Sequence, residues 1–130
     1  MPRNVFISYS HHNAADADWV QAFARSLAER GVNAWVDQSE IRPGESIPEA
    51  IERGLRESDM LVALVSNDSL NRPSLFFELG AALGMGKNVV GVVPEGFDSS
   101  LLPHPLRLRR YLVRRSPEVT AEELIPRAAA

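Results

Sequence analysis

The 130-residue chain fits one domain of ordinary globular composition, with 45% hydrophobic and 24% charged residues. It has no cysteine, which excludes disulfides and thiolate metal sites, and its formal net charge of −3 is opposite to the balance of a general nucleic-acid binder. It also lacks a signal-peptide run and the roughly 20 consecutive apolar residues of a membrane helix. We therefore expect a soluble, cytoplasmic domain that binds neither nucleic acid nor a membrane.

Short apolar runs alternate with segments of helical period, a pattern typical of a parallel sheet covered by helices on both faces. The first strand is expected at residues 5–9. A capping box at residues 13–16 then predicts the start of a helix, which Gly31 is well placed to end. The second strand is expected at residues 34–36.

A polar loop follows at residues 38–45, where the Pro43-Gly44 pair predicts a turn. Residues 46–49 form a second capping box, which predicts the start of the second helix. Residues 60–65 are apolar throughout, as expected for a central parallel strand buried on both faces.

The second half of the chain continues the alternation, with a third helix expected at residues 74–85 and a fourth strand at residues 89–93. The proline-containing stretch at residues 95–105 is expected to be loop. A fifth strand at residues 111–113 and a last helix at residues 121–128 complete the prediction.

Five strands connected in this way predict an α/β fold, a flavodoxin-like five-stranded parallel sheet of order 2-1-3-4-5 with helices on both faces. Ligands of such sheets bind beyond the carboxyl ends of the strands, where the strand order reverses. The side chains expected at that rim are Tyr9, Ser10, His11, Asp37, Ser66 and Asn67.

Glu78 is the ionisable residue that stands out, because it is the only one in the 13 residues from 74 to 86. A helix that is apolar nearly all round is expected to be buried, and a buried carboxylate is costly unless it is paired or functional. A catalytic role and a structural role, on a narrow solvent face or near the helix start, are both open from these features alone.

Other kinds of site find little support in the sequence. The adjacent His11 and His12 do not have metal-ligand spacing, and Ser10 and Ser66 have no partnered histidine and aspartate. There is no glycine-rich phosphate loop, so any NAD would be bound without the Rossmann fingerprint. Five arginines surround the fifth strand, where charges commonly prevent unwanted strand pairing; these are Arg107, Arg109, Arg110, Arg114 and Arg115.

Three segments together resemble the TIR (Toll/interleukin-1 receptor) domain family, in its prokaryotic NAD-cleaving form. Residues 5–10 look like the opening strand motif of the family, and residues 37–47, which contain Pro43 and Gly44, look like its BB loop. Glu78 stands where NAD-cleaving members carry a catalytic glutamate. The resemblance runs over residues 4–113, so residues 1–130 are expected to be a single TIR domain.

The resemblance implies the members of a substrate site. Glu78 would be catalytic, and NAD would be the substrate, with no cofactor and no metal. The side chains implied to bind the substrate are Tyr9, Ser10, His11, Asp37, Ile47, Ser74 and Phe77. Ser74 departs from the family pattern, because many catalytic members have a tryptophan there; Phe76 or Phe77 could supply the missing apolar wall.

One carboxylate suits this chemistry. Ordinary glycosidases need a second carboxyl group to protonate the leaving oxygen, whereas nicotinamide in NAD is already cationic and departs neutral. The expected function is therefore NAD cleavage that releases nicotinamide and forms ADP-ribose or a cyclic ADP-ribose isomer, in prokaryotic antiviral defence signalling.

Two alternatives stay open. The first is a non-enzymatic TIR adaptor that acts by homotypic association. The second is an enzyme like the nucleoside deoxyribosyltransferases, whose nucleophile region resembles residues 77–83. Self-association through TIR–TIR contacts is implied in either TIR reading, and a further domain or partner protein is left open.

Overall fold

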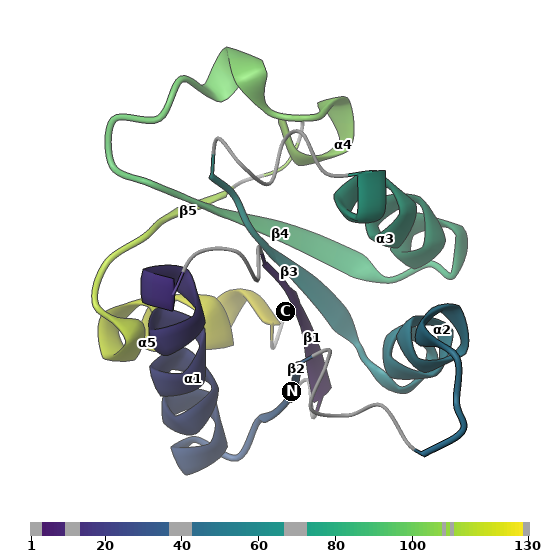
Figure 1. The fold of residues 1–130 in the computed structure, drawn as a ribbon. Helices are drawn as coiled ribbons and strands as arrows, with labels where there is room; N and C mark the ends of the chain where they lie inside the picture. The colour runs from purple at the N-terminus through teal and green to yellow at the C-terminus, as the bar shows by residue number, and fades with distance from the viewer. Residues whose placement is uncertain are drawn as a thin grey trace.

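The computed structural model describes residues 4–9, 14–36, 43–66, 73–107, 109 and 111–128 (Figure 1). Its five strands form one parallel sheet in the order β2-β1-β3-β4-β5. The strands are β1 (Asn4–Ser8), β2 (Asn33–Val36), β3 (Met60–Leu64), β4 (Asn88–Val93) and β5 (Leu112–Val113). The flavodoxin-like order expected from the sequence is confirmed.

Helices cover both faces of the sheet, as Figure 1 shows. They are α1 (Ala14–Glu29), α2 (Ile47–Glu57), α3 (Pro73–Gly84), the short helices η3 (Ser99–Leu101) and α4 (His104–Arg107), and α5 (Pro117–Ala128). The helices α1 and α5 lie together on one face, and α2 and α3 lie on the other. No described helix is both long and apolar enough to cross a membrane.

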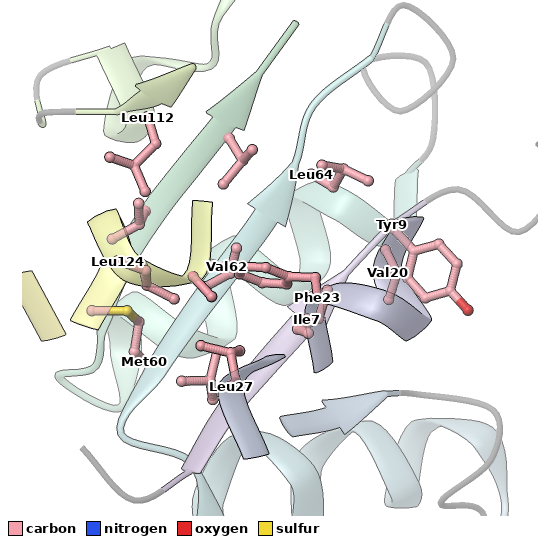
Figure 2. Packing of buried hydrophobic residues seen from close by; sticks show 14 of the residues in the cluster. Ile7, Tyr9, Val20, Phe23, Leu27, Met60, Val62, Leu64, Leu112 and Leu124 are labelled. Carbon is pink, nitrogen blue, oxygen red and sulfur yellow. The ribbon is translucent and has the colours of Figure 1, made fainter. Parts of the chain in front are cut away.

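Two hydrophobic cores result, one on each face. Since successive strand side chains point to opposite faces, Val5 and Ile7 of β1 face α1 and α5, whereas Phe6 belongs to the core beneath α2 and α3. Figure 2 shows the first core, where side chains of the strands meet those of α1 and α5; among those labelled are Ile7, Met60, Val62, Leu64, Leu112, Val20, Phe23, Leu27 and Leu124.

The second core contains a close helix-to-ring contact. Trp35 of β2 stacks on Phe6 with ring centroids 4.6 Å apart, and Gly54 of α2 lies against the indole. A Cβ at Gly54 would stand 2.6 Å from the ring. This glycine therefore allows α2 to approach the sheet more closely than any other residue would.

Local signals place two of the helix ends as expected. The Ser46 side chain accepts a hydrogen bond from the Glu49 backbone N–H, and α2 begins at the next residue. Gly31, with φ of 81°, follows the last turn of α1 in a conformation that suits glycine. In α2, Leu55 is buried and Ile51 is partly buried.

The stretch expected to be loop at residues 95–105 instead contains η3 and the start of α4. Asp98 caps η3 by accepting hydrogen bonds from the hydroxyl and backbone N–H of Ser100, which hold the pKa of its carboxyl below the ordinary value. Pro105 lies in the first turn of α4, where a missing N–H removes no helical bond. Pro105 is therefore compatible with a short helix in this stretch.

The last helix begins at Pro117, four residues before the expected start at residue 121. The Ser116 hydroxyl accepts from the Val119 backbone N–H, and Pro117 occupies the first helical position. The prediction was wrong because it relied on the later apolar residues and overlooked this cap.

Candidate functional site

The carboxyl end of β1 meets the middle of α3 through a buried hydrogen bond. The Ser8 hydroxyl donates to Oε1 of Glu78 over 2.8 Å, and the two residues are 1% and 2% exposed. They lie 70 positions apart in the chain. The bond places the Glu78 carboxylate at the edge of the sheet where ligands of this fold bind.

The sequence dictates this meeting on both sides. In β1, Ser8 shares a face with Phe6, which packs in the core beneath α2 and α3. In α3, Glu78 belongs to the inner stripe made with Leu75, Leu79 and Ala82, which are buried at helical spacing. The packing of these apolar neighbours carries Glu78 to the sheet.

The outer face of α3 corrects the expectation of a helix buried all round. Phe76, Phe77 and Met85 are 50%, 55% and 38% exposed, and Gly80 and Gly84 are exposed between them. The apolar composition of α3 therefore does not signal complete burial. Glu78 is buried because of its place on the inner stripe.

Burial gives the carboxylate a distinct chemical setting. Moving an ionised carboxylate away from water without hydrogen bonds costs many kcal/mol, and a donated hydroxyl bond offsets part of that cost. Charges in such a setting interact more strongly with a developing positive charge than they would in water. Glu78 is thus suited to stabilise a cation formed beside it.

Sequence reasoning did not single out Ser8 as a site residue. Strand alternation and the right-handed rule for parallel crossovers could have identified it. Those rules place α2 and α3 on one face of the sheet and Ser8 on the strand side that faces them. Glu78 of α3 is the ionisable side chain that these rules bring to the same face as Ser8.

Tyr9 lies at the same strand end but belongs to the other face. It is 6% exposed and packs in the core beneath α1, near Val20 and Phe23. Figure 2 shows its hydroxyl pointing away from Phe23 and Ile7. The structure therefore places the Tyr9 ring on the α1 side and Glu78 on the α3 side of β1.

The other side chains predicted to bind substrate are placed only in part. Phe77 lies on the exposed face of α3, next in sequence to Glu78. Ser74 is the second residue of α3 and Ile47 the first of α2, with side chains outside the described part of the chain. Ser10, His11 and Asp37 are outside the described residues altogether. Their roles stay predictions.

A cavity of about 180 Å³ lies at the opposite edge of the sheet, against the first residues of β1 and β2. Its lining residues are Asn4, Asn33, Ala34, Trp35, Glu57 and Ser58. Small-molecule sites usually have about 300–1,000 Å³. The cavity is therefore small for a nucleotide, and it is remote from the strand ends that carry Ser8.

Arginines around β5 make contacts within the domain. Arg114 forms an ion pair with Asp16 of α1, and Arg115 lies 3.3 Å from Glu123 of α5. Arg109 donates to the backbone carbonyl of Pro105. Arg114 and Arg115 thus tie the end of the last strand to α1 and α5, a role that the expected protection of an edge strand did not include.

The chain is similar to known proteins in both sequence and fold. The sequence profile described as TIR domain matches residues 5–125. The chain is 34% identical over 65 residues to the NAD(+) hydrolase PdTIR of Paracoccus denitrificans. It is 29% identical over 79 residues to the 2' cyclic ADP-D-ribose synthase AbTIR of Acinetobacter baumannii.

Two solved structures share the fold. The TIR domain of the Toll-related receptor TRR-2 from Hydra magnipapillata superposes with a TM-score of 0.76 at 18% identity, over 97% of this chain and 98% of that one. The CMP N-glycosidase BcmB of Clostridium botulinum superposes with a TM-score of 0.67 at 17% identity, over 96% and 99%.

The two sequence relatives match over limited stretches. The alignments cover 50% and 61% of this chain, but only 21% of PdTIR and 29% of AbTIR. The chain thus spans less than a third of either relative.

Proposed function

Because the chain belongs to the TIR domain family, we propose that it cleaves the bond between nicotinamide and ribose in NAD, with Glu78 as the catalytic residue. The observation that carries the proposal is the buried Glu78 carboxylate, held by Ser8 at the ligand-binding edge of the sheet. The names of PdTIR and AbTIR, an NAD(+) hydrolase and a cyclic ADP-ribose synthase, support the choice of substrate.

The reaction needs no acid on the leaving group. The bond between the ribose C1′ and the nicotinamide nitrogen breaks, and its electron pair neutralises the positive charge on the pyridinium ring. The ribose is left as an oxocarbenium-like cation, which the Glu78 carboxylate stabilises. Water then adds to C1′ and loses a proton to solvent to give ADP-ribose, or a hydroxyl of the same molecule adds and loses its proton to solvent to give a cyclic isomer.

NAD is the substrate in this proposal, and no resident cofactor is required. Ser10 and His11 after β1, with Asp37 and Ile47 around the loop between β2 and α2, are proposed to line the nucleotide cleft; the buried Tyr9 on the α1 side is left out of it. Ser74 and Phe77 are proposed to contact the nicotinamide or ribose. The product would act in prokaryotic defence signalling, and self-association through TIR–TIR contacts would assemble the active form.

The deciding experiment is incubation of concentrated protein with NAD, with free nicotinamide measured by chromatography. Glu78→Gln should release almost none, while its thermal unfolding stays close to wild type, because a glutamine Oε1 can still accept from Ser8. The matched control is Glu52→Gln, which changes an exposed glutamate of α2 and should leave turnover unchanged.

More than about a tenth of wild-type turnover in Glu78→Gln would correspond to a loss of under ~1.4 kcal/mol of transition-state stabilisation. Glu78 would then not be the main catalytic group. If the wild-type protein releases no nicotinamide at any concentration, the adaptor reading replaces the enzymatic one.

A second candidate is cleavage of the N-glycosidic bond of a nucleotide or nucleoside. Residues 77–83 resemble the nucleophile region of nucleoside deoxyribosyltransferases, and the fold is shared with a CMP N-glycosidase. Incubation with CMP, and separately with a deoxynucleoside and a free base, tests this candidate. Release or exchange of the base without nicotinamide release from NAD would favour it.

A further inference from the structure

The Ser8 hydroxyl is buried and belongs to a paired strand, unlike a donor on the surface or in a loop. Ser8 is the last residue of β1, which is paired with β2 on one side and β3 on the other. It stands directly opposite Ala63 of β3 and is 1% exposed. The donor that holds Glu78 therefore belongs to a strand paired with β3 instead of a loop.

Glu78 needs such a partner because its side chain has three rotatable bonds. The packing of α3 fixes its backbone, but it does not by itself set the rotation of the terminal carboxylate. A hydroxyl has one proton to donate, and here that proton goes to Oε1 over 2.8 Å. This bond restricts the direction in which the carboxylate faces.

We infer that Ser8 is a positioning residue, whose hydroxyl holds the Glu78 carboxylate in the orientation that stabilises the ribose cation. The inference rests on the proposed function, and it adds a residue to the site that touches the catalytic group without touching the substrate. Catalytic groups lose activity when their supporting hydrogen bonds are removed, because a small misorientation weakens interactions made in the transition state.

A purely structural role makes a different prediction. If the bond only attaches α3 to β1, its removal lowers the melting temperature while each folded molecule keeps its full kcat. If the bond positions Glu78, its removal lowers kcat at temperatures where the variant is fully folded. We expect KM to stay close to the wild-type value in the second case, because the Ser8 hydroxyl donates its one proton to Glu78 and so has none to donate to the substrate.

The test uses three variants, assayed for nicotinamide release and thermal unfolding. Ser8→Ala removes the donor and should lower kcat by about 10–100-fold, by analogy with the range seen at metal sites when a hydrogen bond that orients a metal ligand is removed. Ser8→Thr keeps a hydroxyl on the same carbon and should restore most of kcat. Ser58→Ala is the matched control, because Ser58 is also buried and donates to the Gly54 carbonyl over 2.6 Å, in a part of the fold away from Glu78.

Ser58→Ala should lose stability comparable to that of Ser8→Ala but keep wild-type kcat. If Ser8→Ala does not fold, Ser8→Cys, which preserves shape but donates weakly, provides the same comparison. Wild-type kcat in folded Ser8→Ala or Ser8→Cys, with an inactive Glu78→Gln, would overturn the inference and leave the proposed function standing. Wild-type kcat in Glu78→Gln, or no turnover by the wild-type protein, would overturn both.

Discussion

Arg114, immediately after β5, donates from Nη1 to Oδ1 of Asp16 in the first turn of α1, over 2.6 Å and 98 positions of sequence. The guanidinium also lies 4.9 Å from the ring centroid of Trp19. The Asp16 side chain is 7% exposed and that of Arg114 is 22% exposed. The pair is therefore largely shielded from water, and it joins the first helix to the last strand.

Loss of one partner should destabilise the domain strongly. Arg114→Met removes the Arg114 cation from beside the buried Asp16 carboxylate, and we expect a loss of about 3 kcal/mol in the free energy of unfolding. Urea unfolding followed by circular dichroism measures it. The control is Arg115→Met, which breaks a more exposed ion pair with Glu123 and should cost under about 1 kcal/mol. Equal losses in the two variants would contradict a special role for Arg114.

Gly54→Ala should destabilise the second core, since the new Cβ would stand 2.6 Å from the Trp35 ring. We expect a cost of about 1–3 kcal/mol from overpacking. Gly80→Ala is the matched change in α3, where a Cβ meets nothing within 4 Å. That variant should be more stable than wild type by about 0.5–1 kcal/mol, because alanine favours helix over glycine. Destabilisation by both changes would show that the Trp35 contact is not the cause.

Ser74→Trp tests the departure from the family pattern. Ser74 precedes Glu78 by four residues in α3, so the two positions lie on the same helix face, one turn apart. A tryptophan there should lower KM for NAD by supplying an apolar surface for the nicotinamide or ribose. Phe77→Ala, added to the Ser74→Trp variant, separates the contribution of the new tryptophan from that of Phe77. An unchanged KM in Ser74→Trp would mean that Phe76 or Phe77 already supplies this apolar surface, or that the site does not bind NAD.

Activity should depend on self-association through the loop between β2 and α2. Gly44, near the end of that loop, has φ of 81°, which asparagine tolerates and valine does not. Specific activity should rise with concentration in wild type and in Gly44→Asn, and should rise less in Gly44→Val. Sedimentation of the same samples measures assembly. Wild-type activity that stays flat over about a hundredfold concentration range would contradict the assembly proposal.

Strand positions and their order followed from the sequence because the apolar runs are short and well separated. Residues 60–65 could be recognised as a central strand, and β3 is indeed buried along its whole length. The short helices after β4 could not be predicted in the same way. The start of η3 depends on the single cap Asp98, and the start of α5 depends on Ser116. A single capping residue is a weaker signal in a sequence than the period of the apolar residues.

The sequence prediction found one residue of the candidate site and missed its partner. Glu78 was singled out because it is the only ionisable residue in an apolar segment, and its burial is confirmed. Ser8 went unnoticed because a serine in a strand is unremarkable until the fold shows what it faces. The exposure of Phe76 and Phe77 was also hidden, since apolar composition does not reveal which face of a helix is covered.

The sheet ends in two short strands, and this limits how copies of the domain can join. The outer strand β2 has four residues and β5 has two, and β5 pairs with β4 at only two positions. An incoming strand would find too few free backbone groups to extend the ladder, so growth by strand addition is disfavoured. Self-association should consequently leave the amide infrared band of the sheet unchanged, and the assembled protein should not bind dyes that recognise cross-β structure.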